Sequence, residues 1–521
     1  MKSKFKLTKQ GKMVAFILLV IALGALVFGA FKSGFVKPNQ KSEKPKNEVT
    51  ATDDKTSEKQ NETTTSSKSN KMRISLDEWI GWKSILDANG GLTTQPGSIF
   101  DELGLDLEVS IINDGSQSST AMIKGDLDGA GYTVNRYAFL YDKFLQNNVE
   151  VSMPFITNFS TGGDGIIVKD TINKVEDLVG KKVGVPRFSE AQTLVVWLVE
   201  NSDLSDADKQ SIIDNLILFD TPDDAAKAFF AGELDAAGTW QPYLSQAQET
   251  TGCKLLFSTK SAHNLILDGI VFRDDYIEQN RENVEKFIKG ILMAQPMYDT
   301  EFKAIKNSMS LFATETNENI KAMTADGQLA TYNDNDELLN GLAQQVFVDM
   351  SNIWTGLGET AHADKAEDAF DSTVMKVHKD EFSKVETKVP GFTEEQREES
   401  QNIDALLKKS CTINFQPNSA VFANQEEATK TLNEFVKIAK IVNGSIIQIE
   451  GNIASDKDDE SGIALSHQRA KTISEYFKSQ GVDPSRFVII GNGGTKPVAP
   501  NNSEENMAKN RRTDIMFKVI E

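Results

Sequence analysis

The pattern of apolar and polar positions divides this chain into segments of different kinds. Residues 13–31 form an unbroken run of apolar and small residues, about long enough to cross a bilayer as a helix. From 37 to about 70 the chain has almost no large apolar residue, which predicts a disordered tether. Residues 72–382 alternate strand and helix patterns, as α/β domains do. A charged stretch at 386–404 predicts a linker, and a shorter mixed pattern fills 410–521.

One unit occurs twice in the α/β region, at 125–133 and 232–240. In each copy a short helix is expected to end at a glycine, after which small and apolar residues enter a buried, parallel strand. Thr221 can cap the second helix, with Pro222 at its first position. Both strands end in polar or aromatic side chains, where open α/β sheets bind ligands: Tyr132, Thr133, Thr239 and Trp240. Two similar lobes facing one cleft are therefore predicted; the alternative is chance similarity of two short strings.

The periodicity also predicts individual elements. In the α/β region we expect strands at 73–76, 107–112 and 183–186, and helices at 191–200, 282–304 and 336–354, the second of them broken before Pro296. In the C-terminal region we expect strands at 412–415, 445–450 and 514–520, with helices at 425–442 and 463–479.

The apolar run follows a basic tail, residues 1–12, that contains five lysines. The positive-inside rule then leaves the N-terminus cytoplasmic and the bulk of the chain extracytoplasmic, which predicts a single-pass protein of the cell membrane. A cleaved signal peptide is the alternative. The run is longer than a usual signal core and no small-x-small cleavage site follows, so an uncleaved anchor is favoured.

Composition removes several classes of function. The net charge of −20 argues against nucleic acid as a partner, because no basic face is available to neutralise phosphates. The two cysteines lie far apart and are expected to be free thiols, and the four histidines lack metal-ligand spacing. No phosphate-binding glycine loop or nucleophile motif occurs, so we expect neither a cofactor nor a metal, and a binding protein rather than an enzyme.

Several motifs in order resemble ABC-importer substrate-binding proteins of the class that serves nitrate, sulfonates, taurine and thiamine precursors. They are Glu78-Trp79-Ile80-Gly81-Trp82, the two Gly-acid-Leu-Asp repeats, Asp177-Leu178-x-Gly180-Lys181-Lys182-Val183-Gly184-Val185 and Thr239-Trp240-Gln241-Pro242-Tyr243. The resemblance covers roughly 200 residues and implies a two-lobed, hinged, type II periplasmic-binding-protein fold. It also implies an ABC permease as a candidate partner.

The resemblance places the ligand-binding residues at the cleft. Candidates are Trp79, Trp82, Tyr132, Thr133, Ser160, Thr161, Asp164, Ser189, Glu190, Thr239, Trp240 and Asp268. For each of them, core packing or helix capping is the alternative role. The family's ligands are often anions, and Ser189 and Glu190 lie at a predicted helix N-terminus, which favours an anionic group. If two of the acidic candidates line the cleft, an ammonium-bearing or zwitterionic solute fits better.

The C-terminal region resembles the OmpA-like peptidoglycan-associating domain over about 110 residues. The motifs are Phe415-x-x-Asn418-Ser419-Ala420, Ile449-Glu450-Gly451, Leu465-Ser466-x-x-Arg469-Ala470, Gly491-x-Gly493 and Asn510-Arg511-Arg512. In that family an aspartate and an arginine hold the diaminopimelate of the stem peptide. Arg469 and Arg511 match, but Ala454 stands at the aspartate position, with Asp456 two residues on. Peptidoglycan binding is therefore expected to be weak or altered.

The predicted organisation is a basic tail (1–12), a transmembrane anchor (13–31), a tether (32–71), a solute-binding domain (72–385), a linker (386–409) and an OmpA-like domain (410–521). The predicted fold class is α/β, a two-lobed type II periplasmic-binding-protein fold followed by a small α+β domain, with one N-terminal transmembrane helix. The predicted function is capture of a small organic solute, anionic or zwitterionic, outside the cell. The alternative is an envelope scaffold or sensor in which this fold serves no importer.

Overall fold

The computed structural model describes residues 71–384, 391–455 and 460–520. The predicted basic tail and anchor lie outside these residues, as does the tether apart from Lys71. Among the described helices, none has the length and apolar content that a membrane crossing requires.

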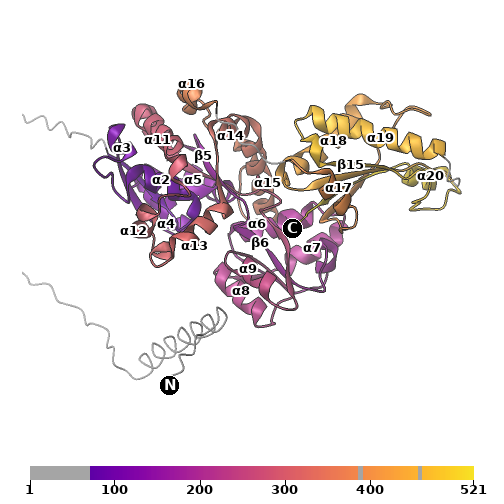
Figure 1. The fold of residues 1–521 in the computed structure, drawn as a ribbon, viewed down its shortest axis with the longest axis horizontal. Helices are drawn as coiled ribbons and strands as arrows, with labels where there is room; N and C mark the ends of the chain where they lie inside the picture. Colours follow the sequence, from indigo (N-terminus) through magenta and orange to yellow (C-terminus); the bar gives the residue numbers. More distant parts are fainter. Residues whose placement is uncertain (1–70, 385–390, 456–459, 521) are drawn as a thin grey trace, which may run out of the picture. The chain divides into compact units, whose positions relative to one another are not determined.

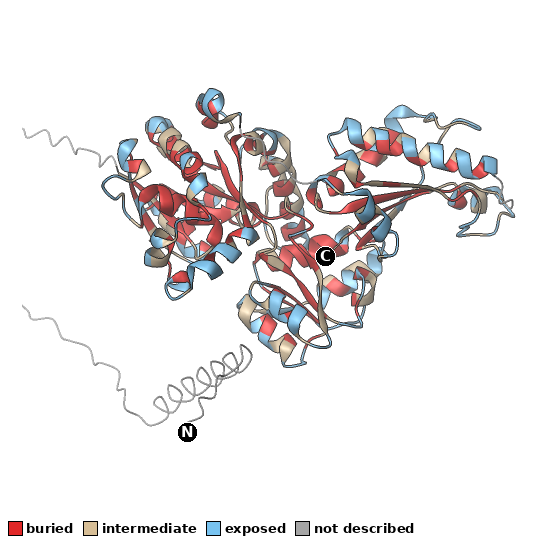
Figure 2. Cartoon of the chain, viewed as in Figure 1, coloured by how far each residue is buried: buried red, intermediate tan, exposed pale blue. Residues whose placement is uncertain are grey.

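The first lobe is built on a seven-stranded mixed sheet with the order β12-β5-β11-β3-β1-β2, in which β4 also pairs with β11. Its strands are β1 (Lys71–Leu76), β2 (Asp106–Ile111), β3 (Gly129–Thr133), β4 (Val151–Ser152), β5 (Ile156–Ser160), β11 (Leu267–Arg273) and β12 (Gly327–Leu329). Strand β1 runs parallel to β2 and β3, whereas β11 is antiparallel to β3. Figure 2 shows buried residues along the strands and on the inner sides of the helices.

Helices cover this sheet (Figure 1). They are α2 (Lys83–Asn89), α3 (Ile99–Glu102), α4 (Gly115–Lys124), α5 (Val134–Gln146), α10 (Asp274–Gln279), α11 (Arg281–Ala294), α12 (Lys303–Ser308), α13 (Asn317–Met323), α14 (Tyr332–Glu337), α15 (Ala343–Gly356) and α16 (Lys379–Phe382). The helix predicted at 282–304 ends at Ala294, because Pro296 continues only as a short 3-10 turn. The helix predicted at 336–354 is interrupted at Asn340 and Gly341, which have non-helical backbone angles.

The second lobe has a five-stranded sheet with the order β10-β6-β9-β7-β8. Its strands are β6 (Asp164–Lys169), β7 (Val183–Pro186), β8 (Ile217–Phe219), β9 (Ala236–Trp240) and β10 (Cys253–Ser258), and its helices are α6 (Glu190–Glu200), α7 (Asp206–Asp214), α8 (Pro222–Phe230) and α9 (Tyr243–Glu249). The chain passes between the sheets at 161–163 and returns at 259–266. Helix α15 packs against α5 of the first lobe and α6 of the second.

The two repeated units occupy equivalent places in the two lobes. One is α4 followed by β3, the other α8 followed by β9. A glycine of positive φ follows each helix: Gly125 at 77° caps α4, and Gly232 at 81° comes directly after Ala231, the C-cap of α8. Thr221 caps α8 by accepting a hydrogen bond from the Asp224 N–H at 3.1 Å. Each repeat strand is parallel to one neighbour and antiparallel to the other, so the parallel pairing predicted for them is only half of the arrangement.

The C-terminal region forms a four-stranded sheet with the order β13-β16-β14-β15. Its elements are α17 (Glu394–Ser400), β13 (Leu407–Cys411), α18 (Gln425–Ile441), β14 (Ile446–Gly451), α19 (Glu460–Ser479), β15 (Phe487–Gly491), α20 (Glu504–Asn510) and β16 (Thr513–Lys518). Figure 1 shows α18 and α19 on one side of this sheet, where Ile447 and Ile449 are fully buried.

The prediction of a strand at 412–415 is wrong, because β13 already ends at Cys411. Its sequence, Leu-Lys-Lys-Ser-Cys, has little apolar content, and as an edge strand it needs to bury little. The segment predicted as a linker contains α17, which Thr393 caps. Arg397 fixes this helix by donating hydrogen bonds to the carbonyl oxygens of Phe392 and Ser485, both at 3.0 Å.

A buried ion pair holds α2 in the first lobe. Lys83 Nζ donates to Asp87 Oδ2 at 2.5 Å and to the Met297 carbonyl oxygen at 3.1 Å, and the two side chains are 0% and 1% exposed. Burial lowers the pKa of Lys83 and raises the pKa of Asp87 to about 7. Each charge therefore depends on the other for compensation.

We expect Lys83→Met to lower the free energy of unfolding by about 3–5 kcal/mol, since it leaves Asp87 buried without its partner. The double variant Lys83→Met/Asp87→Leu should recover most of this loss. Chemical denaturation followed by tryptophan fluorescence measures both. Lys321→Met is the control, because its pair with Asp299 is exposed and should be worth less than about 1 kcal/mol. Equal losses in the single and double variants would contradict this account.

Candidate functional site

The candidate site lies where strands and helices of both lobes end or begin. In the first lobe, Asp77 follows β1 and Thr133 ends β3, while Asp268 in β11 stands opposite Thr133 in the antiparallel pairing. In the second lobe, Asp164 begins β6 and Glu190 begins α6. The polar side chains of the site are therefore fixed by regular elements.

An ion pair joins the two lobes at this site. Arg136 on α5 donates from Nε to Glu190 Oε1 at 3.0 Å and from an Nη atom to Oε2 at 2.8 Å. The Thr133 hydroxyl adds a hydrogen bond to Glu190 Oε1 at 2.9 Å. Burial alone would raise the pKa of Glu190, but Arg136 outweighs it and the pKa is lowered. The carboxylate of one lobe thus stays ionised against the guanidinium of the other, and we call this pair the latch.

Three further carboxyl groups lie close enough to interact electrostatically with the latch. Burial raises the pKa of Asp164 to about 7, although the Ser160 hydroxyl donates to it at 2.7 Å. Burial also raises the pKa of Asp77, which accepts from the Trp82 indole N–H at 2.5 Å. All three take up protons more readily than free carboxyl groups do, because each ionised form would be both desolvated and repelled.

Asp268 is the most enclosed of the three. Asp268 is 3% exposed, and its Oδ2 atom has no hydrogen-bond partner among the described residues. Burial raises its pKa well above the usual range, and the charges of Asp77, Asp164 and Glu190 add to the effect. An unpaired polar atom at this depth carries a desolvation cost that a bound donor would remove.

Trp79 closes the site from the side of the first lobe. Its indole N–H donates to Asn158 Oδ1 at 2.9 Å, and Asn158 stands opposite Asp268 in the pairing of β5 with β11. The ring lies against Gly163 between the lobes, where a Cβ atom would come within 2.5 Å of it. Only glycine at 163 therefore allows the crossover to approach the indole so closely.

The structure brings Trp79, Thr133, Ser160, Asp164, Glu190 and Asp268 of the predicted set into this cluster. Trp82 lies in the core at 1% exposure and reaches the cluster through its N–H. The other predicted side chains have structural partners: Tyr132 with Ser118, Thr161 with Ala325, Ser189 with Pro186 and Gln192, and Thr239 with Pro222. Trp240 is 44% exposed. Ligand contact by all of these residues stays a prediction.

Sequence reasoning missed Asp77, Arg136, Asn158 and Tyr298. Arg136 stands three residues after the capping Thr133, and Asp77 directly precedes the tryptophan motif, so position alone pointed to both. Tyr298 carried no such signal in the sequence. In the structure it donates to the Gly327 carbonyl oxygen at 2.6 Å, and its pKa is raised by burial and by the charge of Asp268.

The candidate wall-binding residues lie in the C-terminal domain. Arg469 on α19 donates from Nε to the Ser419 carbonyl oxygen at 3.0 Å, and its guanidinium lies 5.0 Å from the centre of the Phe415 ring. Burial lowers its pKa, and the charge of Arg511 acts in the same direction. Arg511 is paired with Glu504. Asp456 lies outside the described residues.

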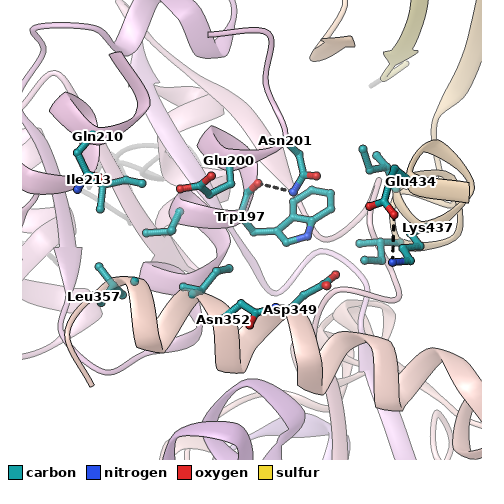
Figure 3. A pocket seen from close by; sticks show the side chains of 15 residues that line it. Trp197, Glu200, Asn201, Gln210, Ile213, Asp349, Asn352, Leu357, Glu434 and Lys437 are labelled. Carbon is teal, nitrogen blue, oxygen red and sulfur yellow. Dashed lines mark hydrogen bonds and ion pairs between the residues drawn. The ribbon is translucent and has the colours of Figure 1, made fainter. Parts of the chain in front are cut away.

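A separate pocket is lined by α6, α7, α15 and α18 (Figure 3). Trp197 and Asp349 face it, and burial raises the pKa of Asp349 to about 6. Its lining contains none of the predicted ligand-binding residues.

Two family models match this chain. Residues 78–313 match the NMT1-like family and residues 414–511 match the OmpA family. The chain joins an NMT1-like segment to an OmpA-family segment. This confirms the fusion that the sequence motifs indicated, and the matching proteins are of solute-binding and OmpA type rather than enzymes.

Curated relatives match the OmpA-family segment. A peptidoglycan-associated lipoprotein of Pseudomonas putida is 32% identical over 112 residues, which are 22% of this chain and 66% of the relative. Outer membrane protein A of Bordetella avium is 32% identical over 89 residues, 17% of this chain and 46% of the relative. The chain thus spans less than two thirds of either relative.

Solved structures align with the NMT1-like part. The aliphatic sulphonate binding protein SsuA of Escherichia coli aligns with 16% identity and a TM-score of 0.45, over 57% of this chain and 96% of that one. The nitrate-binding protein NrtA of Synechocystis aligns with 10% identity and a TM-score of 0.45, over 60% and 89%.

The raised pKa of Asp164 predicts a pH dependence of stability. Folded Asp164 keeps a proton that the unfolded chain releases near pH 4. Its contribution to the free energy of unfolding is therefore complete below that pH and is lost as the pH rises towards about 7. Across this window the slope from one group is at most about 1.4 kcal/mol per pH unit. Asp164→Asn should therefore flatten the curve of unfolding free energy against pH between 4.5 and 8. Asp106→Asn, at an exposed position, is the control; parallel curves for all three proteins would refute the assignment.

Proposed function

We propose that the chain is a membrane-anchored, extracytoplasmic solute-binding protein of the ABC-importer type. The segment 72–385 captures a small organic solute between its lobes, and the segment 410–521 associates with peptidoglycan. The anchor at 13–31, preceded by the lysine-rich tail, would hold the protein at the cell membrane, where an ABC permease is the candidate partner.

The observation that supports this most is the latch. Arg136 and Glu190 come from different lobes, and their side chains are 26% and 15% exposed, so the lobes enclose an ion pair between them. The lobes are connected at 161–163 and 259–266, which are short segments at the ends of strands. Such connections can absorb the backbone rotation of hinge closure, as in two-lobed binding proteins.

The peptidoglycan part of the proposal is supported by the OmpA-family match and by Arg469. Among the described residues no carboxylate forms an ion pair with this guanidinium, so a ligand carboxylate could receive its remaining donors. The family's aspartate is replaced by Ala454, which removes the direct partner for the ligand's ammonium group.

The latch predicts how the lobes move. Glu190→Gln leaves Arg136 without its charge partner, a change worth roughly 2–5 kcal/mol at a buried hydrogen-bonded pair, and should shift the lobes towards an open state. Spin labels at Lys124 on α4 and Lys227 on α8, with both native cysteines replaced by serine, report the distance between the lobes. We expect a longer and broader distance distribution in Glu190→Gln, and recovery of the shorter distance on addition of a bound solute.

The matched control is Glu233→Gln, an exposed glutamate of the second lobe, which should leave the distances unchanged. Identical distributions in the wild type and Glu190→Gln, with and without every solute tested, would show that the lobes do not act as a hinged trap.

For the wall-associating segment, we expect purified sacculi to retain the protein through Arg469. Arg469→Ala should weaken retention at least tenfold, about 1.4 kcal/mol, because the bidentate contact with a carboxylate is lost. Ala454→Asp should strengthen it by restoring an acidic partner for an ammonium group. Lys471→Ala, exposed on the same helix, controls for general loss of positive charge. Retention that is tight and indifferent to Arg469→Ala would place the wall contact elsewhere.

A further inference from the structure

We propose that the cleft selects a small organic solute that carries a positively charged nitrogen, and that this nitrogen binds at the free Oδ2 atom of Asp268. This rests on the proposed solute-binding function and adds the charge class of the ligand. On this proposal the site does not capture a plain anion such as a sulfonate or nitrate. A zwitterionic ligand would bind through its positively charged group.

The charges that face the cleft support a cation. Four carboxyl groups, from both lobes, interact with one another there: Asp77, Asp164, Glu190 and Asp268. Arg136 is the cation that acts on Asp77 and Asp164, and Glu190 already occupies it through two hydrogen bonds. An anionic solute would have to displace Glu190 from Arg136 and leave that carboxylate buried without a partner, which is costly.

Asp268 supplies the binding atom. Asp77 accepts from Trp82, Asp164 from Ser160 and Glu190 from Arg136, whereas Oδ2 of Asp268 is buried without a donor. The polar atoms of a protonated amine or amidine are all hydrogen-bond donors. Such a group can therefore donate to Oδ2 and at the same time compensate the negative charge of the carboxylate. A neutral or anionic acceptor would do neither.

Aromatic side chains lie near the strand that carries Asp268. Trp79 donates to Asn158, which stands opposite Asp268 in the pairing of β5 with β11, and the charge of Asp268 adds to the raised pKa of the buried Tyr298. Aromatic faces attract cations, and the attraction grows when both partners are desolvated. An alkylammonium group that keeps an N–H would therefore find both a carboxylate and an aromatic surface.

Binding should be coupled to proton release. The raised pKa values of Asp164 and Asp268 favour their protonated forms, and a bound cation favours their ionised forms. Affinity should then rise with pH up to about neutral. The charges that act on Asp268 are those of Asp77, Asp164 and Glu190. Arg136 acts on Asp77 and Asp164, Asp326 acts on Asp164, and the charge of Asp268 acts on Tyr298.

The test uses the full chain and three sets of probes at constant ionic strength. Cations with N–H donors are ethylammonium and benzamidine; anions are nitrate and methanesulfonate; taurine represents zwitterions. Thermal shift and calorimetry should show stabilisation by at least one cation, stronger at pH 8 than at pH 5.5, and none by the anions. Asp268→Asn should weaken that binding at least tenfold, while Asp106→Asn should leave it unchanged.

A second variant makes the result independent of how well Asp268→Asn folds. Glu190→Gln frees Arg136, so it should gain stabilisation by methanesulfonate that the wild type lacks. Wild-type protein stabilised by the anions and by no cation would overturn the inference and leave the solute-binding function standing. Stabilisation by no probe of any charge, in wild type and variants alike, would overturn both. Cation binding unaffected by Asp268→Asn would overturn the assignment to Asp268.

Discussion

The burial of several carboxyl groups around one guanidinium is the constraint on which the cleft depends. Arg136 can compensate one negative charge, and it compensates Glu190, across the boundary between the lobes. The pKa values of Asp77, Asp164 and Asp268 are raised, so a proton or a positive partner stabilises each of them. This condition connects the charge of a ligand with pH.

The fold positions this charge cluster through regular elements. Asp77 and Thr133 stand at the ends of parallel strands, and Asp268 is aligned with Thr133 by the antiparallel pairing of β11 with β3. The opposite lobe contributes only the first residues of β6 and α6. Because each lobe is internally well packed, a rotation at the connecting segments would separate Arg136 from Glu190 without disturbing either sheet.

Much of this architecture could be predicted from the sequence, and particular residues show why. Thr221, Pro222 and Gly232 act locally, so the ends of α8 followed from chain chemistry alone. Glu190 and Asp268 were identified as acidic candidates, but the latch was not, because its partner Arg136 lies 54 residues away and meets it only in the fold. Ser189 and Thr239 matched family positions, yet the structure gives them backbone partners. The strand at Leu407–Cys411 was missed since an edge strand rich in lysine carries no apolar signal.

A high-resolution crystal structure of the chain grown with a stabilising organic cation shows most directly where the cation's nitrogen binds. The account predicts density for that compound between the lobes, with its charged nitrogen about 3 Å from Oδ2 of Asp268 and the Arg136–Glu190 pair intact. A compound bound elsewhere, with Asp268 still lacking a donor, would contradict it. So would an anion bound directly to Arg136 in place of Glu190.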